Sequence, residues 1–330
     1  MNFEAMSIQS TLHKLASATH CKNPLVILVI SLLGSLEVRA QDPSLPPTDI
    51  GLANVYDGII GKAKFIYQGF SQAYEPKKLY DDRGNDTHSG LKIGSVLVMN
   101  QFIYMTPVKV LGGELGFTTL VPVVKISSSN LDGQAPSVNP GVLGDIIAGA
   151  AIQWSDRKLF QKSFFHRAEI DITMPSGTYD TRYAVNASAR LWTFSTYHAF
   201  TLLLTDKISI SARNHFNYNT HIIGTQVKPG AFYNGNYSID YSLCKTLKIE
   251  AAAYYVTQFN QDSFDGNSHY YQDNYGLTTT KEHVLGYGPG LAYFAPGGVL
   301  VEVKTFFEAD AQNRFSGSRP TLRLAIPLDK

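Results

Sequence analysis

The stretch LGYGPGLAYFAPGGVLVEVKTFFEA, residues 285–309, joins a glycine-rich run to a segment in which charged and apolar residues alternate. Three glycines in GYGPG could cradle a phosphate, but such a loop leads from a strand into a helix whose N-terminus faces the anion. Here the sequence APGG, residues 295–298, would stop that helix before it forms. Gly286, Gly288 and Gly290 recur at every second position, so in a strand they share one face. The stretch is therefore predicted to be a β-hairpin whose inner face carries a stripe without side chains.

Details of this hairpin follow from its residue types. The bare stripe would leave room for bulky neighbours, a bound ligand or a sharp bend. Pro289 lacks the N–H group that a sheet ladder needs, which predicts a β-bulge at that position. Pro296 and Gly297 suit a type II turn. On the second strand the charged residues fall together on the predicted inner face: Glu302, Lys304 and Glu308.

Strand-like segments recur along the whole chain. With 19 Tyr, 18 Phe and 27 Gly in 330 residues, the composition suits aromatic-rich strands joined by turns. The twelve predicted strands span residues 64–74, 92–105, 110–126, 144–155, 164–174, 185–204, 207–218, 230–243, 247–260, 283–294, 299–311 and 319–326. Long connections mostly alternate with short ones, as they do in bacterial outer-membrane barrels. The predicted fold is all-β: an antiparallel transmembrane β-barrel of about 12 strands, with short periplasmic turns and longer external loops.

Polar and apolar side chains take opposite faces in several of these strands. Such alternation is typical of a membrane barrel with a polar interior, and equally of half-buried strands in a soluble sheet. The number of strands, the alternating connections and the N-terminal region described next favour the membrane barrel. The residues predicted to line its lumen are Arg167, Glu169, Asp171, Arg213, His215, Lys248, Glu250, Glu302, Lys304, Glu308 and Arg323. Opposite charges on facing strands would brace and narrow the pore.

The N-terminal region indicates export. Basic residues precede an apolar run, residues 25–36, that is too short to cross a bilayer as a helix, and a small-residue cleavage pattern ends at Ala40. We predict a secretory signal peptide over residues 1–40, cleaved near Ala40. A flexible, Pro-rich lead-in over residues 41–60 and a barrel domain over residues 61–330 would then form the mature protein.

Composition and motifs argue against several functional classes. A net charge of +1 argues against a nucleic-acid binder. The predicted mature chain has one cysteine, Cys244, so neither an internal disulfide nor a cysteine-based zinc site is expected. No nucleophile elbow, zinc-protease motif or phosphate-binding loop occurs, and spacing alone links none of His88, His166 and His215 to a serine. We predict no catalytic residues, no cofactor and no metal site.

Two predicted loops are rich in Asp, Asn and Gly, namely residues 80–90 and 260–276. Their oxygen atoms could coordinate Ca²⁺, but neither loop has the spacing of an EF-hand, and turn formation is the preferred interpretation. The second loop also carries four aromatic residues: Phe264, Tyr270, Tyr271 and Tyr275. These would either form an adhesive surface for apolar ligands at the barrel mouth or pack the loop against the barrel rim.

Six short motifs, taken in order, resemble one protein family. They are LGGELGF (111–117), GDIIAGAAIQW (144–154), MPSGTYD (174–180), YNGNYSIDY (233–241), GYGPGLAY (286–293) and ADAQNRFSG (309–317). The order resembles the meta-pathway phenol-degradation protein family of Gram-negative bacteria, over nearly the whole predicted mature chain. This resemblance implies an exported outer-membrane barrel, related in role to porin-like transporters of hydrophobic compounds, that helps aromatic substrates enter the cell.

The expected function is passive transport. A lumen bounded by about twelve strands is largely occupied by side chains and is narrower than that of a 16–18-stranded porin. We expect a non-enzymatic channel in the outer membrane of a Gram-negative bacterium that assists uptake of small aromatic or hydrophobic compounds. Outer-membrane lipid and the outer-membrane assembly machinery would be its partners. Two alternatives stay open: an outer-membrane enzyme that hydrolyses lipids or esters, and a closed structural or soluble periplasmic β-protein without transport.

Overall fold

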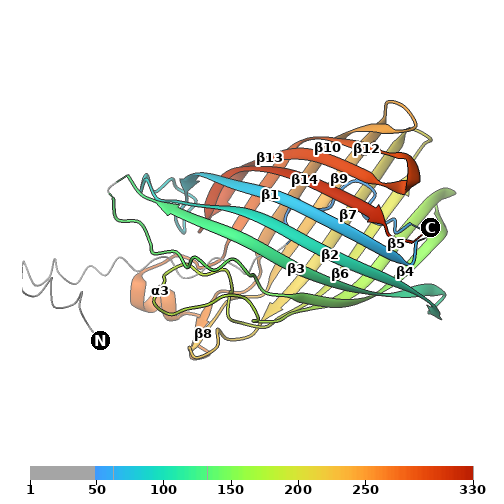
Figure 1. The fold of residues 1–330 in the computed structure, drawn as a ribbon. Coiled ribbons are helices and arrows are strands. Elements are labelled where there is room, and N and C mark those ends of the chain that lie inside the picture. Colours follow the sequence, from blue (N-terminus) through green and yellow to red (C-terminus); the bar gives the residue numbers. More distant parts are fainter. Residues whose placement is uncertain (1–48, 62, 132, 330) are drawn as a thin grey trace, which may run out of the picture. The chain divides into compact units, whose positions relative to one another are not determined.

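The computed structural model describes residues 49–61, 63–131 and 133–329, and these residues form a closed β-barrel (Figure 1). Its twelve strands follow one another around the barrel in chain order, and the pairing of the first strand with the last closes the ring. All neighbouring barrel strands are antiparallel. The predicted fold class and strand number are confirmed. The predicted signal peptide, residues 1–40, lies outside the described residues.

The bounds of the elements are as follows. The barrel strands are β1 (Phe65–Leu79), β2 (Lys92–Val110), β3 (Gly113–Ser129), β4 (Ile147–Leu159), β5 (Lys162–Thr173), β6 (Thr193–Leu203), β7 (Ile208–Asn219), β9 (Phe232–Ser242), β10 (Leu247–Gln258), β12 (His283–Phe294), β13 (Leu300–Gln312) and β14 (Phe315–Pro327). The smaller elements are the paired strands β8 (Val227–Lys228) and β11 (Ser263–Phe264), the helix α3 (Tyr270–Tyr275) and the 3₁₀ turn η1 (Pro296–Gly298). Within the described part of the chain, no helix is both long and apolar enough to cross a bilayer.

The two ends of the barrel differ in their connections. One end, here called the short-turn end, carries the β2–β3, β4–β5, β6–β7, β9–β10 and β12–β13 turns, together with the C-terminal end of β14. The opposite end, here called the long-loop end, carries the longer connections. β8 and α3 lie there (Figure 1, left), and β11 is paired with β8. This asymmetry is the one that the sequence predicts.

Most strand boundaries differ from the prediction by up to five residues, and one differs by more. The strand predicted over residues 185–204 begins only at Thr193, because Arg190 has a φ of 56° and the Ala189 N–H donates to Asp145 Oδ2 at 2.8 Å, which holds this segment in a loop. At the same end of the barrel, β13 and β14 are joined by Asn313 and Arg314 alone rather than by a longer connection. Asn313 has a φ of 53°, a left-handed conformation that asparagine tolerates in tight turns.

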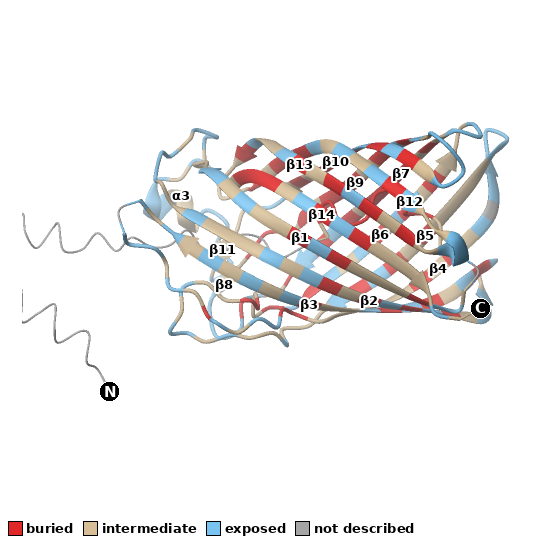
Figure 2. Ribbon diagram, turned by 45° about the horizontal axis from the view of Figure 1, so that its top comes forward, coloured by how far each residue is buried: buried red, intermediate tan, exposed pale blue. Residues whose placement is uncertain are grey.

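Exposed and buried residues alternate along the strands (Figure 2). On β5, Ile170 and Ile172 are exposed, whereas Glu169 and Asp171 are buried. The barrel is therefore apolar outside and polar inside, which is the reverse of a soluble globular protein and the arrangement of a membrane barrel.

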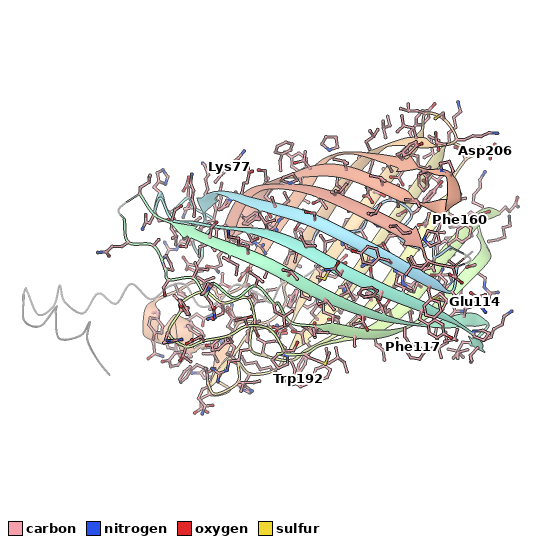
Figure 3. All side chains as sticks on the ribbon, viewed as in Figure 1. Lys77, Glu114, Phe117, Phe160, Trp192 and Asp206 are labelled. Atoms are coloured by element: carbon pink, nitrogen blue, oxygen red, sulfur yellow. The ribbon has the colours of Figure 1, made fainter. Side chains whose placement is uncertain are left out.

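Aromatic side chains mark both ends of the outer surface. Near the short-turn end, the rings of Phe65 and Tyr104 stack with centroids 4.7 Å apart, and Phe117 is exposed on the neighbouring strand. Towards the long-loop end, Trp192 and Tyr218 are exposed. Figure 3 shows Phe117 and Trp192 separated along the barrel. Two such levels are typical of aromatic belts at the interfaces of a bilayer.

The hairpin over residues 285–309 forms as predicted, with one correction. Gly297 has a φ of 81° and a ψ of 8°, the geometry of the third residue of a type II turn. No bulge lies at Pro289, because the β12–β13 register is the same on both sides of it, and the irregularity occurs instead between His283 and Leu285. A Cβ atom at Gly288 would lie 1.8 Å from the Thr305 carbonyl oxygen, so the two strands approach too closely there for any side chain.

Candidate functional site

Residues 49–60, here called the N-terminal segment, lie inside the barrel. Leu52 is 2% exposed and Val55 is 0% exposed. The segment runs towards the short-turn end, where Ile60 packs against Ile66 and Ile103 before β1 begins. The expectation of a flexible lead-in is therefore wrong for residues 49–60, because their apolar side chains are buried and their polar groups have partners on the barrel wall.

Two carboxylates of the N-terminal segment bind one arginine of the wall. Arg213 of β7 donates from Nη1 to Asp49 Oδ2 at 2.8 Å and from Nε to Asp57 Oδ2 at 2.6 Å. Arg167 of β5 donates to the Asp57 carbonyl oxygen at 3.2 Å and forms an ion pair with Glu169 at 3.1 Å. The charged residues predicted to line the lumen thus form ion pairs and hydrogen bonds, both with the N-terminal segment and among themselves. Pairing of this kind is what allows charges to be buried.

The opposite side of the wall binds the segment in the same manner. Lys304 of β13 donates to Asn54 Oδ1 at 2.7 Å and also contacts Glu302, which is 0% exposed. Arg323 of β14 donates to the Val55 carbonyl oxygen at 3.0 Å and pairs with Glu302 at 3.2 Å. The segment is therefore held from both sides of the lumen, by β5 and β7 and by β13 and β14.

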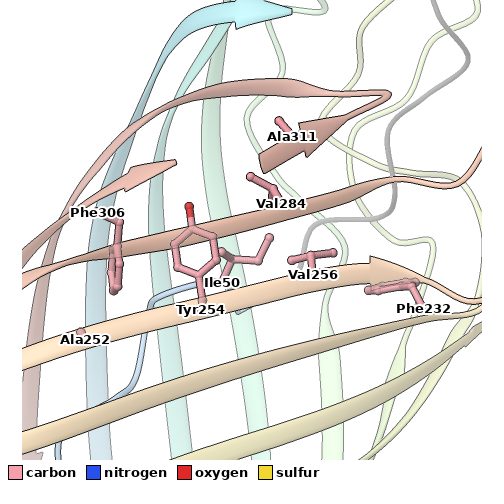
Figure 4. Packing of buried hydrophobic residues seen from close by; sticks show 8 residues of the cluster. All are labelled: Ile50, Phe232, Ala252, Tyr254, Val256, Val284, Phe306 and Ala311. Carbon is pink, nitrogen blue, oxygen red and sulfur yellow. The ribbon is translucent and has the colours of Figure 1, made fainter. Parts of the chain in front are cut away.

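Apolar contacts complete the attachment. Ile50 belongs to a buried cluster with Phe232, Tyr254 and Phe306, which project from three different strands (Figure 4). The side chain of Leu52 packs in a second cluster with Phe70 of β1. Since these aromatic residues come from opposite parts of the sequence, the N-terminal segment ties together strands that are not neighbours in the sheet.

All eleven predicted lumen residues lie on the inner face, and their surroundings differ. Arg167, Glu169, Arg213, Glu302, Lys304, Glu308 and Arg323 all take part in ion pairs. His215 stacks on Tyr197 with ring centroids 4.3 Å apart, and Lys248 Nζ lies 4.5 Å from the centroid of the Tyr56 ring. Among the described residues, the Glu250 carboxylate has no hydrogen-bond partner, and the same holds for Oδ1 of Asp171.

The glycine stripe of β12 is occupied by neighbouring side chains. A Cβ atom at Gly286 would lie 2.2 Å from Cζ of Tyr254, and one at Gly290 would lie 2.3 Å from Oε2 of Glu250. The stripe thus serves the first of the three roles considered for it, that of making room for bulky neighbours.

The Tyr254 side chain belongs to a hydrogen-bond network that the sequence did not predict. Its hydroxyl donates to Glu308 Oε1 at 2.6 Å, and Arg319 Nε donates to the same oxygen at 2.9 Å. Tyr74 of β1 donates to Glu308 Oε2 at 3.0 Å. Arg319 was not among the predicted lumen residues. Its only signal in the sequence is its spacing from Arg323, the other charged residue of β14. The N-terminal segment does carry apolar residues, namely Ile50, Leu52 and Val55, but the prolines that precede them favour a linker.

The loop aromatics gather at the long-loop end. The rings of Phe264 and Tyr270 stack with centroids 4.4 Å apart, and Tyr271 and Tyr275 lie 5.3 Å and 6.0 Å from Tyr270. They form one cluster on β11 and α3, held to β8 by the pairing of Phe264 with Val227. Whether this cluster meets a ligand stays a prediction.

The loop over residues 80–90 uses its aspartates for turns. Asp81 Oδ1 accepts hydrogen bonds from the N–H groups of Asn85 and Arg83 at 2.8 Å and 2.9 Å, and these bonds hold the pKa of the Asp81 carboxyl below its usual value. Among the described residues, no group of three or more His, Cys, Asp or Glu side chains is arranged to hold a metal ion.

A cavity of about 50 Å³ lies in the lumen between the N-terminal segment and the long-loop end. Its apolar lining comes from Leu120, Ile147 and Phe232. Its polar lining includes Asp49, Arg213 and His215, already described, and the following residues at the long-loop ends of β5, β6 and β7: Asp171, Thr173, Thr193, Ser195 and Asn217.

The barrel is similar in fold to solved structures of other proteins. Among solved structures, an outer-membrane channel of Pseudomonas putida F1 is similar in fold, with a TM-score of 0.67 and 13% sequence identity over 86% of this chain and 99% of that chain. The KdgM porin gives a TM-score of 0.41 with 10% identity over 79% and 98%, and a mutant of the TodX monoaromatic hydrocarbon channel gives 0.39 with 10% identity over 81% and 91%. No curated protein matches the sequence significantly.

The sequence itself shows the family. The family described as "Putative MetA-pathway of phenol degradation" matches residues 77–324, which extend from β1 to β14. The resemblance stated from six short motifs is thereby confirmed, and the fold is that of an outer-membrane channel. The chain belongs to the putative MetA-pathway of phenol degradation family.

Proposed function

We propose that this protein is a passive channel of a Gram-negative outer membrane that assists the uptake of small aromatic or hydrophobic compounds. The observation that carries the proposal is the lumen: a polar interior in an apolar barrel, with a cavity open for a small molecule above the N-terminal segment. Membership of a family linked to phenol degradation supplies the compound class. The mechanism requires no energy source, since solutes would follow their own gradient.

The proposed orientation follows from the connections. Long loops face the outside and short turns face the periplasm in bacterial outer-membrane barrels. The cavity would then face arriving solutes, and the N-terminal segment would lie on its periplasmic side. Outer-membrane lipid would contact the exposed aliphatic residues, and the assembly machinery would insert the barrel after cleavage of the signal peptide near Ala40.

The N-terminal segment governs how narrow the proposed path is. It holds Asp57 against Arg213 and Asn54 against Lys304, so it fills the lumen between β5–β7 and β13–β14. A solute of one aromatic ring would have to pass beside this segment or displace it. Only small solutes are therefore expected to cross, and slowly.

Uptake into liposomes tests the proposal. Purified full-length mature protein is reconstituted, and the entry of phenol and of a neutral trisaccharide is followed over time. Faster phenol entry than in protein-free liposomes, without faster trisaccharide entry, is expected. Equal phenol rates with and without protein would refute transport. Equal acceleration of both solutes would refute selectivity for small compounds.

The hydrolase alternative finds no support in the placement of the histidines. His88 contacts Asp86 in a loop, His166 lies on the outer surface 3.3 Å from His198, and His215 stacks on Tyr197 inside the lumen. A hydrolytic triad needs a serine, a histidine and an orienting carboxylate in contact. These three histidines lie on separate surfaces, so we do not advance a second function.

A further inference from the structure

We infer that an apolar solute leaves the lumen cavity sideways, through a seam in the barrel wall between β3 and residues 142–144, and enters the bilayer without passing the N-terminal segment. This exit rests on the proposed function, because solutes must first reach the cavity. The seam is closed in the structure by hydrogen bonds, so the exit requires it to open.

The ladder between β3 and β4 ends in the middle of β3. Its last pair is Leu120 with Ile147, although β3 stays paired with β2 as far as Ser129. On the other edge of β3, within the described part of the chain, residues 142–144 take the place of β4 and are joined to β3 by an isolated bridge. The outer half of β3 therefore borders a loop segment instead of a strand.

Among the described residues, two backbone hydrogen bonds close this seam. The Val124 N–H donates to the Val142 carbonyl oxygen at 2.7 Å, and the Gly144 N–H donates to the Pro122 carbonyl oxygen at 2.9 Å. Opposed residues in a regular antiparallel ladder can exchange two such bonds, but Pro122 has no N–H to return to Gly144. The seam is thus held less firmly than a regular ladder of the same length.

On its other side, the same loop segment is fixed to the β5–β6 connection. The Leu143 carbonyl oxygen accepts from the Thr178 N–H at 2.7 Å. Asp145 accepts from the N–H groups of Gly177 at 2.9 Å and of Ala189 at 2.8 Å. Opening a barrel wall unpairs backbone groups in hydrocarbon, which is costly, so a wall opens most readily where fewer groups are paired. Opening is therefore expected along β3, while the segment stays attached to the β5–β6 connection.

The lumen cavity borders this seam. Leu120 and Ile147, the last pair of the β3–β4 ladder, both line the cavity. On the outer surface, Val123 and Leu143 are 37% and 38% exposed, so the seam presents apolar side chains to the bilayer. A solute that parts the seam would pass from an apolar part of the cavity directly to hydrocarbon.

Partition favours this exit for apolar solutes. On the axial route, the N-terminal segment and its bonds to Arg167, Arg213 and Lys304 stand between the cavity and the short-turn end. An apolar solute would have to displace these polar groups, whereas in the bilayer it meets hydrocarbon alone. A polar solute has the opposite preference and would keep to the axial route. The seam would thus sort solutes by their solubility in hydrocarbon.

A disulfide across the seam tests the exit. Because the two hydrogen bonds flank Val123 and Leu143, these residues form a non-hydrogen-bonded pair with Cα atoms about 4.5 Å apart, within the range of a disulfide. The variant Val123→Cys/Leu143→Cys is made together with Cys244→Ser, so that the exposed thiol of Cys244 cannot compete. Entry of radiolabelled toluene is measured in intact cells of a Gram-negative host that exports the full-length chain, with and without a reductant.

The oxidised variant should admit toluene no faster than cells that lack the protein, and the reductant should restore the rate of the unmodified protein. Ionic conductance in planar bilayers, which reports the axial route, should not change. The matched control is Ile249→Cys/Leu291→Cys, also with Cys244→Ser. Ile249 and Leu291 are directly opposed on β10 and β12 and each is 44% exposed, so their disulfide should leave toluene entry unchanged.

A second variant replaces the first if oxidation yields no disulfide. Pro122→Ala supplies the missing N–H opposite Gly144. One added hydrogen bond in the closed seam should slow toluene entry roughly two- to tenfold. Heat-modifiable gel mobility checks the folding of every variant. Unchanged toluene entry in the variant that is used, or a fall in conductance that parallels the fall in toluene entry, would overturn the inference.

The two proposals fail distinguishably. If the unmodified protein accelerates toluene entry and the oxidised variant does so equally, the sideways exit is refuted and the channel stands. If the unmodified protein accelerates neither toluene entry into cells nor phenol entry into liposomes, the channel is refuted and the exit falls with it.

Discussion

Single residues inside this barrel are constrained mainly by the side chains opposite them. Gly286 is the clearest case, because the Tyr254 ring lies over it and in turn meets Phe306 with ring centroids 4.9 Å apart. The hydroxyl end of the same tyrosine is fixed by Glu308, which Arg319 also binds. One missing Cβ atom on β12 thus permits a hydrogen-bonded network that links β10, β13 and β14.

Substitution of Gly286 by alanine tests this constraint. The added Cβ atom would lie 2.2 Å from Tyr254 Cζ, so the ring must leave its buried position. We expect a loss of about 1–3 kcal/mol in the free energy of unfolding, as for other overpacked cores. Urea titration of the barrel, followed by its heat-modifiable gel mobility, measures it. Gly61→Ala is the matched control, since a Cβ atom there meets nothing within 4 Å. A Gly286→Ala barrel as stable as Gly61→Ala would contradict the prediction.

At the scale of elements, the N-terminal segment differs most from what its local sequence predicts. Prolines precede it, and an isolated view of residues 41–60 suggests a linker. Inside the lumen, however, its backbone and side chains are bound by charged residues of β5, β7, β13 and β14. Those charges would otherwise face each other across the pore. The lumen charges therefore hold the segment in place, and the segment supplies the groups with which these charges pair.

Deletion of residues 49–60 should open the pore. The barrel closes through the pairing of β1 with β14, to which the segment does not belong, so the barrel itself should still fold. Water would replace the segment around Arg167, Arg213 and Lys304, and ionic conductance in planar bilayers should rise severalfold over that of the full-length protein. Heat-modifiable mobility of the deletion variant is the control for folding. A folded variant with unchanged conductance would show that the segment does not limit the pore.

At the scale of the whole barrel, a closed ring of strands has an apolar outer surface and a polar interior. Aliphatic and aromatic side chains such as Ile170, Phe216 and Val303 are exposed on the outside, whereas Glu302 and Lys304 are buried within. A soluble protein with this much exposed apolar surface would aggregate. Such a surface is stable in contact with the hydrocarbon core of a bilayer.

Cell fractionation tests the molecule at this scale. Expressed with its full N-terminal region in a Gram-negative host, the protein should appear in the outer-membrane fraction. It should migrate faster on a gel before boiling than after, because a closed barrel resists detergent unfolding. Recovery only from the soluble periplasmic fraction, or identical mobility before and after boiling, would contradict the membrane-barrel interpretation.

Much of this architecture is local and could be predicted. The alternation of Arg167, Glu169 and Asp171 with Ala168, Ile170 and Ile172 is a property of consecutive residues, and it sets which side of β5 faces inward. The same reasoning located all twelve strands. Its clearest failures are at Thr193 and at Pro289, where a loop anchored by Asp145 and a close approach of two strands are contacts between distant residues.

By itself, the sequence determined the all-β barrel, the number of strands, the inward-facing charges and the family, because periodicity and short motifs are written in neighbouring residues. Only the tertiary structure decided what those charges bind. Arg213 meets Asp57 across 156 positions of the chain, and Arg323 meets Val55 across 268. No local pattern encodes such pairs, since they arise only when the ring has closed around the N-terminal segment.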